Sequence, residues 1–523
     1  MYFLDNIGNN KKKHLEKIVL LLFASFLISI FVLLLCDSTF RINKNIISNF
    51  FIKLFFLFFV SLSSILFIWV YNKLSLKNIS LKLWQQTVII LIITSLPRIL
   101  SITFIKVIPS NDFLTYHTLA SKLSKGSVAF NDYISMFPHV IGYPSLLAIF
   151  YKLFGSSVIV ANILNIILAC GISVLLFIIG SEIKNVKCGF WAAVLWALCP
   201  SQILFTNIVC AEYIFTFFLF LFFCLLIILL KRLKNFLTSI IFFCVLGILC
   251  ALTNALRPLG PLIVLSVLIF YITFYKQKGY IFNVVVTKFI LIFVFLIFYF
   301  ISNLIINSTI STVIKRNAAS FPVGFTMYIG SNAKYGGIWN RDDSINVSKI
   351  ESKSKMKPQE IHDYLLKQAL YRFKQQGIKE NISLFINKFK IMWLGDIDAV
   401  FIVNNPGATY NLGSSNSLGN NINMYFILGI VISLLYYYFL LTLCILYIIS
   451  YSENVKSKYS LLLVIFILGM VLLHLLVEAA PRYHFYSIPL FSLIASLGVY
   501  GIQQRFVQKT IIKNRHFRHP VVF

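Results

Sequence analysis

The sequence predicts an all-α polytopic membrane protein with about twelve transmembrane helices and a mainly helical outer domain. Hydrophobic residues make up 59% of the 523 residues and charged residues only 12%, whereas a soluble domain usually has about 25% charged residues. Mean hydropathy is +0.86. The apolar residues also come in runs of about 20, the length that a helix needs to cross the hydrocarbon core. The chain is therefore expected in the cell membrane.

The predicted spans are the apolar runs that polar or basic residues bound on either side. The first run follows a basic stretch, but it is long and lacks a small-residue cleavage site. We interpret it as a retained anchor and not as a signal peptide. The spans are expected near residues 18–36, 51–71, 84–107, 157–180, 189–206, 212–230, 236–256, 258–275, 281–306, 424–449, 460–477 and 485–502.

Lysine and arginine fall on alternate connections between these spans, which predicts the orientation. With both termini in the cytoplasm, every inner connection is basic, as the positive-inside rule requires. This pattern, together with contacts to anionic membrane lipids or phosphate, accounts for the net charge of +29. No nucleic-acid partner is expected.

Two outer connections are long, and they define the expected domain organisation. The first covers residues 108–156, and the second holds eight of the 17 acidic residues. In the second, Ile361, Leu365, Ala369 and Phe373 share one helical face, and residues 404–421 form a Gly/Ser/Asn-rich loop. The expected parts are a basic segment with two additional helices (1–83), a membrane core (84–306), an extracytoplasmic domain (307–422), C-terminal spans (423–502) and a basic cytoplasmic tail (503–523).

The few charged residues near the outer ends of the spans are the candidates for a site. Charge within a span costs about 2.5–3.5 kcal/mol and usually marks a cavity or a partner. Arginine binds phosphate through two parallel hydrogen bonds, and a carboxylate can act as a general base or bind a metal. The residues therefore predict a pocket in the outer leaflet that transfers a group from a lipid phosphate. Its candidate members are Asp112, Asp132, Glu212, Glu478, Arg98, Arg257 and Arg482.

Each candidate also has a structural alternative. Asp112 could cap the helix that begins after Pro109, and Glu212 could hydrogen-bond across helices. Arg257 could reach the lipid headgroups, and Glu478 could pair with Arg482 four residues later. The histidines at 117, 139 and 484 fit no metal-ligand spacing, and the cysteines lie mostly inside apolar runs as packing residues.

Several motifs resemble one known family when they are taken in order. They are "NDFLTYHTLASKLSKG" followed by "YPSLLAIFYKLFG", then "CPSQILFTNIVCAEYIFTFF", "NALRPLGPLI", "MYIGSNAKYGGIWNRDD" and "EAAPRYHFYSIPLF". Over residues 84–502 the chain resembles the GT-C glycosyltransferases, and the closest group is the bacterial relatives of protein O-mannosyltransferases and aminoarabinose transferases. The resemblance implies a GT-C-like core, to which the two helices within residues 1–83 are an addition.

The resemblance also implies roles for the site residues. Asp112 matches the loop acid that acts as catalytic base or orients the acceptor, with Glu212 and Asp132 as supporting acids. Arg257 and Arg482, with Arg98 as a further candidate, match positions that hold the phosphate of a lipid carrier. Further pocket candidates in the same motifs are Tyr116, His117, Tyr143, Glu478 and Tyr483.

The expected reaction moves a sugar from a polyprenyl-phosphate donor to a protein, lipid or cell-wall polymer on the outer face, with inversion in a single displacement. No cofactor is assigned, and a single Asp in place of an acidic pair leaves a divalent cation as an open alternative. Two other functions stay open. One is a ligase or polymerase of lipid-linked glycans, and the other is a secondary transporter.

Overall fold

A computed structural model describes residues 2–36, 50–76, 81–128, 130–232, 235–275, 284–354, 356–404, 424–451 and 457–516. All regular elements in these ranges are helices, and none is a strand. The predicted loop after Asn404 and the last part of the basic tail lie outside the described residues.

Nine helices in the described ranges are long and apolar enough to cross a membrane, so the chain is a multi-pass membrane protein. Each corresponds to a predicted span. They are α1 (Tyr2–Cys36), α2 (Phe50–Leu76), α3 (Leu83–Phe104), α7 (Val158–Ile183), α10 (Glu212–Arg232), α11 (Phe236–Leu256), α13 (Val284–Ile314), α19 (Met424–Ser450) and α20 (Lys458–Leu476).

The three other predicted spans take less regular forms. Residues 189–206 form α8 (Val186–Ala197) and α9 (Pro200–Leu204), with a bend of 61° between them. Pro200 has no N–H to continue the helical ladder, which explains the break. The span near 258–275 is the short helix α12 (Gly260–Thr273), and the span near 485–502 forms the first half of α21 (Ser487–His516).

Helix α13 continues past residue 306, where hydropathy places the end of its span. Its last two turns are polar, but their hydroxyl groups bond back to helix carbonyls, as Thr309 does to Ile305 (2.8 Å) and Ser311 to Asn307 (2.9 Å). Hydropathy therefore marks the expected lipid boundary and not the end of the helix.

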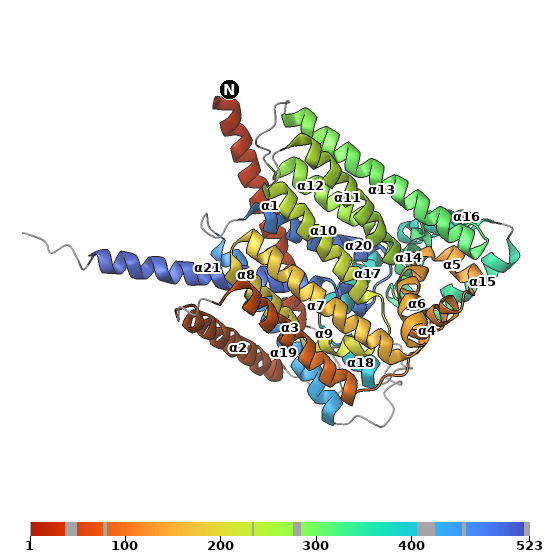
Figure 1. The fold of residues 1–523 in the computed structure, drawn as a ribbon, viewed down its shortest axis with the longest axis horizontal. Helices are drawn as coiled ribbons and strands as arrows, with labels where there is room; N and C mark the ends of the chain where they lie inside the picture. Colours follow the sequence, from red (N-terminus) through yellow and green to blue (C-terminus); the bar gives the residue numbers. More distant parts are fainter. Residues whose placement is uncertain are drawn as a thin grey trace, which may run out of the picture.

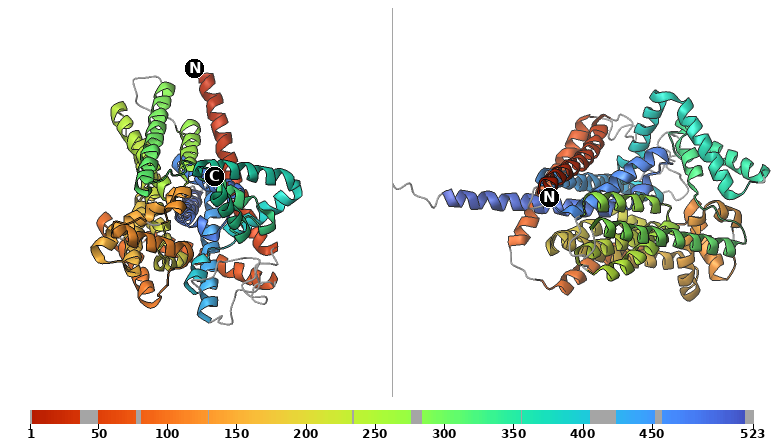
Figure 2. Two further views of the ribbon diagram at one scale, coloured as in Figure 1. Left: turned by 90° about the vertical axis from the view of Figure 1, so that its right-hand side faces the viewer. Right: turned by 90° about the horizontal axis from the view of Figure 1, so that it is seen from above.

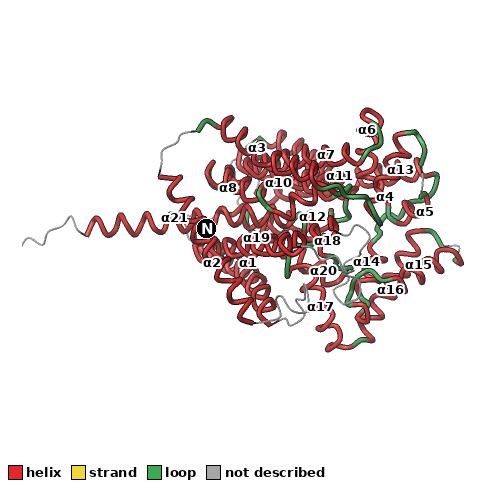
Figure 3. The backbone as a smooth tube through the Cα atoms, turned by 90° about the horizontal axis from the view of Figure 1, so that it is seen from below, coloured by secondary structure: helices red, strands yellow, loops and turns green. Residues whose placement is uncertain are grey.

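The shorter helices gather at one end of the bundle, opposite the end from which α1 begins and α21 extends (Figure 1). The helices of the first outer connection and those of residues 323–393 lie next to each other there (Figure 2), and much of the described non-helical chain lies at this end (Figure 3). The elements are α4 (Asn111–Ser124), α5 (Asn131–Met136), η1 (Pro138–Ile141), α6 (Gly142–Phe154), η2 (Phe205–Asn207), α14 (Val323–Gly330), η3 (Ala333–Tyr335), α15 (Arg341–Lys353), α16 (Pro358–Gln375), α17 (Gly377–Trp393), α18 (Asp398–Asn404) and η4 (Pro481–His484).

A small apolar core joins the first outer connection to the later helices. Met136 of α5 packs with Tyr328 of α14, Val347 of α15 and the buried face of α16. That face contains Ile361, Leu365 and Ala369, which confirms the predicted helical periodicity. The backbone adds two links, from Ala319 N–H to the Ser135 carbonyl (2.8 Å) and between His362 Nε2 and the Met136 carbonyl (3.0 Å). The two outer segments therefore form one packed unit.

The two N-terminal helices pack against the C-terminal half of the chain. The ring of Phe26 in α1 lies 5.0 Å from Trp393 of α17, and Phe67 in α2 lies 5.5 Å from Phe439 of α19. Helix α1 therefore packs against α17, and helix α2 packs against α19.

Candidate active site at one end of the bundle

Helix α4 brings Asp112 to the end of the bundle where the short helices gather. Ser110, in extended conformation, is the residue that precedes the helix, and Asp112 lies in the first turn. Its carboxylate accepts a hydrogen bond from the guanidinium of Arg482, 370 residues later in the chain. The Asp112 side chain is 48% exposed, so it lies at the mouth of the site. Asp112 therefore acts as the ion-pair partner of Arg482 and does not cap the helix.

Arg482 is held on the short helix η4 between aromatic rings. Its guanidinium carbon lies 5.3 Å from the centre of the Phe113 ring and 5.8 Å from that of Tyr483. The positive charge of Arg482 lowers the pKa of Asp112 below its usual value, and this effect outweighs burial. Among the described residues, Arg482 forms its ion pair with Asp112 and not with Glu478, which lies four residues earlier in the chain.

A second ion pair, between Arg257 and Glu212, lies in the same cluster. Glu212 begins α10 and is fully buried, and Arg257 follows the last turn of α11 with a side chain only 15% exposed. Arg257 therefore makes a buried pair and does not reach outward to headgroups. Glu212 Oε2 and Arg257 Nε are both buried without a hydrogen-bond partner in the described structure. A buried pair with unsatisfied atoms of this kind is costly, which is typical of a binding site.

Aromatic residues connect the two ion pairs into one site. The Tyr483 ring lies 5.6 Å from the Arg257 guanidinium and also borders Arg482. Tyr116 lies one turn after Asp112, close enough to both ion pairs to interact electrostatically with them. Burial raises the pKa of Tyr116 to about 12. Its ring meets that of Tyr143 at 5.6 Å, edge to face. The predicted residues Asp112, Tyr116, Tyr143, Glu212, Arg257 and Tyr483 thus lie together with Arg482.

Glu478 lies in the same cluster, on the segment between α20 and η4. Its carboxyl is buried, and burial raises its pKa to about 7 against the opposing charge of Arg482. The backbone of this segment is fixed by two hydrogen bonds, from Glu478 N–H to the Thr326 carbonyl (2.8 Å) and from Ala479 N–H to the Gly337 carbonyl (3.0 Å). The helices of residues 323–393 therefore set the position of Glu478.

Gly330 permits this close contact between the outer helices and the segment of Glu478. A Cβ atom at Gly330 would lie 2.4 Å from the Val477 carbonyl carbon and 2.6 Å from Glu478 N. Lys388 of α17 adds a tie across the same contact. Its ammonium group donates to the carbonyls of Gly330 (2.9 Å) and Leu475 (2.7 Å).

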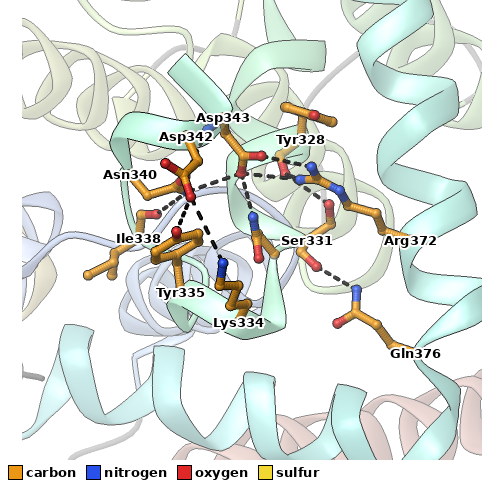
Figure 4. Close-up of polar contacts among 11 residues, drawn as sticks. Tyr328, Ser331, Lys334, Tyr335, Ile338, Asn340, Asp342, Asp343, Arg372 and Gln376 are labelled. Atoms are coloured by element: carbon orange, nitrogen blue, oxygen red, sulfur yellow. Dashed lines mark hydrogen bonds and ion pairs between the residues drawn. The ribbon is translucent and has the colours of Figure 1, made fainter. Parts of the chain in front are cut away.

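A buried ion pair between Arg372 and Asp343 stabilises the segment 327–343, which contains Gly330 and Gly337 (Figure 4). Arg372 of α16 donates to both carboxylate oxygens of Asp343, at 2.7 and 3.2 Å, and its guanidinium stacks 3.8 Å from the Tyr328 ring. Asn332 (2.7 Å) and Asn340 (3.0 Å) complete the hydrogen bonds to Asp343. The motif "MYIGSNAKYGGIWNRDD" is thus a packed element that supports the site.

Sequence reasoning missed two further acids at this site, Asp396 and Asp398. Asp396 is buried and accepts from Ser201 of α9, while its other oxygen lies 3.2 Å from Nε2 of His484. Asp398 is buried near Arg482 and His484, and burial raises its pKa to about 6. Both belong to the acid-rich outer segment, where a carboxylate is ordinarily solvated. Their only sequence signal is the apolar setting of "WLGDIDAVF".

Three predicted candidates lie apart from this cluster. Arg98 is buried within the bundle, where it donates to the carbonyls of Thr94 and Ala197 (both 2.9 Å) and stacks on Trp196. Asp132 forms an exposed ion pair with Arg316 at the end of α13. His117 lies beside the Tyr151 hydroxyl at 2.7 Å. Arg98 ties α3 to α8, although its Nε and Nη2 are buried without a hydrogen-bond partner, and Asp132 ties the first outer connection to the residue pair that follows α13.

No three His, Cys, Asp or Glu side chains of the described ranges are placed to hold a metal ion together. Two acids of the site, Asp112 and Glu212, are paired with guanidinium groups instead. The divalent cation that the sequence leaves open therefore has no donor set of this kind among those residues.

Comparisons with known proteins give little direct guidance. No protein-family model and no curated protein matches the chain. Among solved structures, the chain is similar to ArnT from Cupriavidus metallidurans bound to undecaprenyl phosphate, with 8% identity and a TM-score of 0.32 over 80% of this chain and 77% of that one. A TM-score of this size does not establish a common fold.

Proposed function

We propose that the chain is a membrane glycosyltransferase that moves a sugar from a polyprenyl-phosphate donor to an acceptor on the outer face of the membrane. The observation that carries the proposal is the convergence of Arg257, Arg482 and Asp112 in one site at a single end of the helix bundle. The positive-inside pattern places this end on the outer side. The GT-C resemblance of the motifs that supply these residues supports the same function.

The two guanidinium groups suit the phosphate of a lipid carrier. Arginine presents a planar set of donors that matches phosphate oxygens. Arg257 directly follows the spanning helix α11, and Arg482 lies on η4 shortly after the spanning helix α20. Negative charge grows on the phosphate as the bond from sugar to phosphate breaks. Arginines already held in place by Glu212 and Asp112 stabilise that charge without reorganising.

The reaction requires only one displacement. The acceptor hydroxyl attacks the anomeric carbon from the face opposite the phosphate, so the configuration inverts. Asp112 lies at the exposed mouth of the site, where it is placed to hold the acceptor hydroxyl. One of its carboxylate oxygens accepts a hydrogen bond from Arg482. The predicted membrane core (84–306), extracytoplasmic domain (307–422) and C-terminal spans (423–502) each contribute to this site in the proposal.

A transporter places its charged groups near the middle of the membrane, at the interface of its repeats. Here the charged residues lie on the short helices α4 and η4 and at the ends of the spanning helices α10 and α11. This position favours an enzyme that acts on headgroups at the membrane surface.

The test incubates the purified protein with each of a panel of radiolabelled undecaprenyl-phosphate sugars. Water serves as the acceptor, and the release of undecaprenyl phosphate is measured. We expect release by the wild type and slower release by Asp112→Asn. The matched control is Asp363→Asn, which changes an exposed acid of α16 at the same end of the molecule. Absence of release from every donor, together with solute uptake into proteoliposomes, would refute the proposal.

A further inference from the structure

The contacts of Asp112 limit how well it can accept a proton. One carboxylate oxygen is already hydrogen-bonded to a guanidinium. Displacement chemistry at the anomeric carbon needs a group that takes up the hydroxyl proton of the acceptor as the new bond forms. An anion stabilised by its own arginine is a weak base for that step, because its pKa falls further from neutral pH.

Glu478 and Asp398 are the buried acids of the site that lie outside the ion pairs of the described residues, and Glu478 is the one with Asp112 as a charged neighbour. The ion pairs of the described residues engage Asp112 with Arg482 and Glu212 with Arg257, and Glu478 belongs to neither. Its side chain is buried, and its backbone N–H is bonded to the Thr326 carbonyl, which fixes the main chain at this position to the outer helices. Its charged and titratable neighbours are Arg482 and Tyr483 of η4, Asp112 of α4, Tyr133 of α5, Lys388 of α17 and His474 of α20.

We propose that Glu478 is the catalytic proton acceptor and that Asp112 orients the acceptor hydroxyl. The inference rests on the proposed glycosyl transfer and assigns one step in it. As the acceptor oxygen bonds to the anomeric carbon, the bond from that carbon to the phosphate oxygen breaks and its electron pair remains on the lipid phosphate. The hydroxyl proton passes to the Glu478 carboxylate, which later releases it to water.

The electrostatics of the site agree with this assignment. Burial raises the pKa of Glu478 to about 7, so at neutral pH about half of the carboxyl groups are ionised and able to accept a proton. The negative charge of Asp112 also raises the pKa of Glu478, whereas Arg482 and Lys388 lower it. Removal of each neighbour therefore has a defined effect on the pH at which Glu478 ionises.

The experiment is the pH profile of undecaprenyl phosphate release by wild type, Glu478→Gln and Asp112→Asn, with exposed Glu380→Gln of α17 as the matched control. In the wild type and the control, activity rises with pH through an apparent pKa near 7. Glu478→Gln loses about 10²- to 10⁴-fold in rate and no longer shows this rise. Asp112→Asn is slower but keeps the rise, which moves to lower pH because a neighbouring negative charge is gone.

Binding of undecaprenyl phosphate, measured for each variant, separates a chemical role from misfolding. Glu478→Gln should bind it within about threefold of wild type, a difference of roughly 0.7 kcal/mol. The assignment is overturned if Glu478→Gln retains the rise, or if Asp112→Asn is the variant that loses it. Normal release by Glu478→Gln would overturn the assignment of Glu478 but not the proposed transferase function. No release by the wild type from any donor would overturn both the assignment and the function.

Discussion

The buried pair between Arg372 and Asp343 gives the most direct test of how the outer helices are held together. Replacing Arg372 with Met removes both hydrogen bonds to a carboxylate that is only 2% exposed, and the cation–π contact with Tyr328. Removing one partner of a buried pair costs about 3–5 kcal/mol. Because the Arg372 side chain is 26% exposed, and two asparagines remain as donors, we expect the lower end, about 3 kcal/mol.

The assay is amide hydrogen exchange of peptides from α14, α15 and α16. Since about 1.4 kcal/mol corresponds to a factor of ten, the loss should speed exchange in these helices by about 10²-fold and leave α7 and α10 unchanged. The control is Arg341→Ala, which alters an exposed arginine beside the same loop. Equal protection in wild type and Arg372→Met, or an equal loss in Arg341→Ala, would refute the reasoning.

The same pair predicts a pH dependence with a defined sign. Burial alone would raise the pKa of Asp343, but the hydrogen bonds from Arg372, Asn340 and Asn332 outweigh it and lower the pKa. A lowered pKa in the folded state stabilises the protein above the unfolded value of about 3.9, and this stability is lost as the pH falls through the folded value. The difference in exchange between wild type and Arg372→Met should therefore shrink below about pH 4.

Three further substitutions test other parts of the structure. Arg98→Met should lower thermal stability by about 1–3 kcal/mol, because two buried carbonyls lose their donor, while undecaprenyl phosphate binding stays at the wild-type level; weaker binding would return Arg98 to the site. Gly330→Ala forces a Cβ against the backbone of Glu478, and we expect a cost of about 1–3 kcal/mol together with slower release of undecaprenyl phosphate; an unchanged rate in a destabilised protein would show that Glu478 does not depend on this contact. Lys388→Met removes a positive charge that lowers the pKa of Glu478, so the rise of activity with pH should move to higher pH. A profile that moves to lower pH would contradict the assigned electrostatics.

The membrane-spanning part of the fold could be predicted closely because its cause is local. Burying the backbone in lipid requires a continuous helix, so a long apolar run has one stable form. The run 236–256 became α11 (Phe236–Leu256), and 424–449 became α19 (Met424–Ser450). The run 189–206 forms two helices with a bend of 61° between them, and Pro200 marks this bend in the sequence.

The membership of the site could be predicted in part, but its pairing could not. A charged residue beside an apolar run is visible in the sequence, which is how Asp112, Glu212 and Arg257 were found. The local rule favours Glu478 as partner of Arg482, because they are four residues apart. However, α20 ends at Leu476, before both residues, and Ala480 between them is extended, so the helical spacing does not apply and Arg482 meets Asp112 from the other end of the sequence instead.

Burial of acids inside a polar segment is hidden from sequence reasoning for a different reason. Asp396 and Asp398 become notable only because their segment is buried against other elements, with α9 and η4 contacting Asp396, and that packing depends on contacts between distant segments. Hydropathy compares each residue with its neighbours along the chain. It therefore finds a charge in an apolar run but not a charge covered by tertiary structure.

The same distant contacts explain why the outer helices belong to the site. Thr326 and Gly337 hold the backbone on which Glu478 lies, and Arg482 follows four residues later. A disturbance of α14 or α16 therefore reaches both the proposed base and one proposed phosphate ligand without touching the membrane spans. Variants such as Arg372→Met should slow transfer as well as loosen the outer helices, and the loss of rate should follow the loss of protection. If Arg372→Met loosened these helices and left the transfer rate unchanged, the outer helices would be a cover on the site and not part of its support.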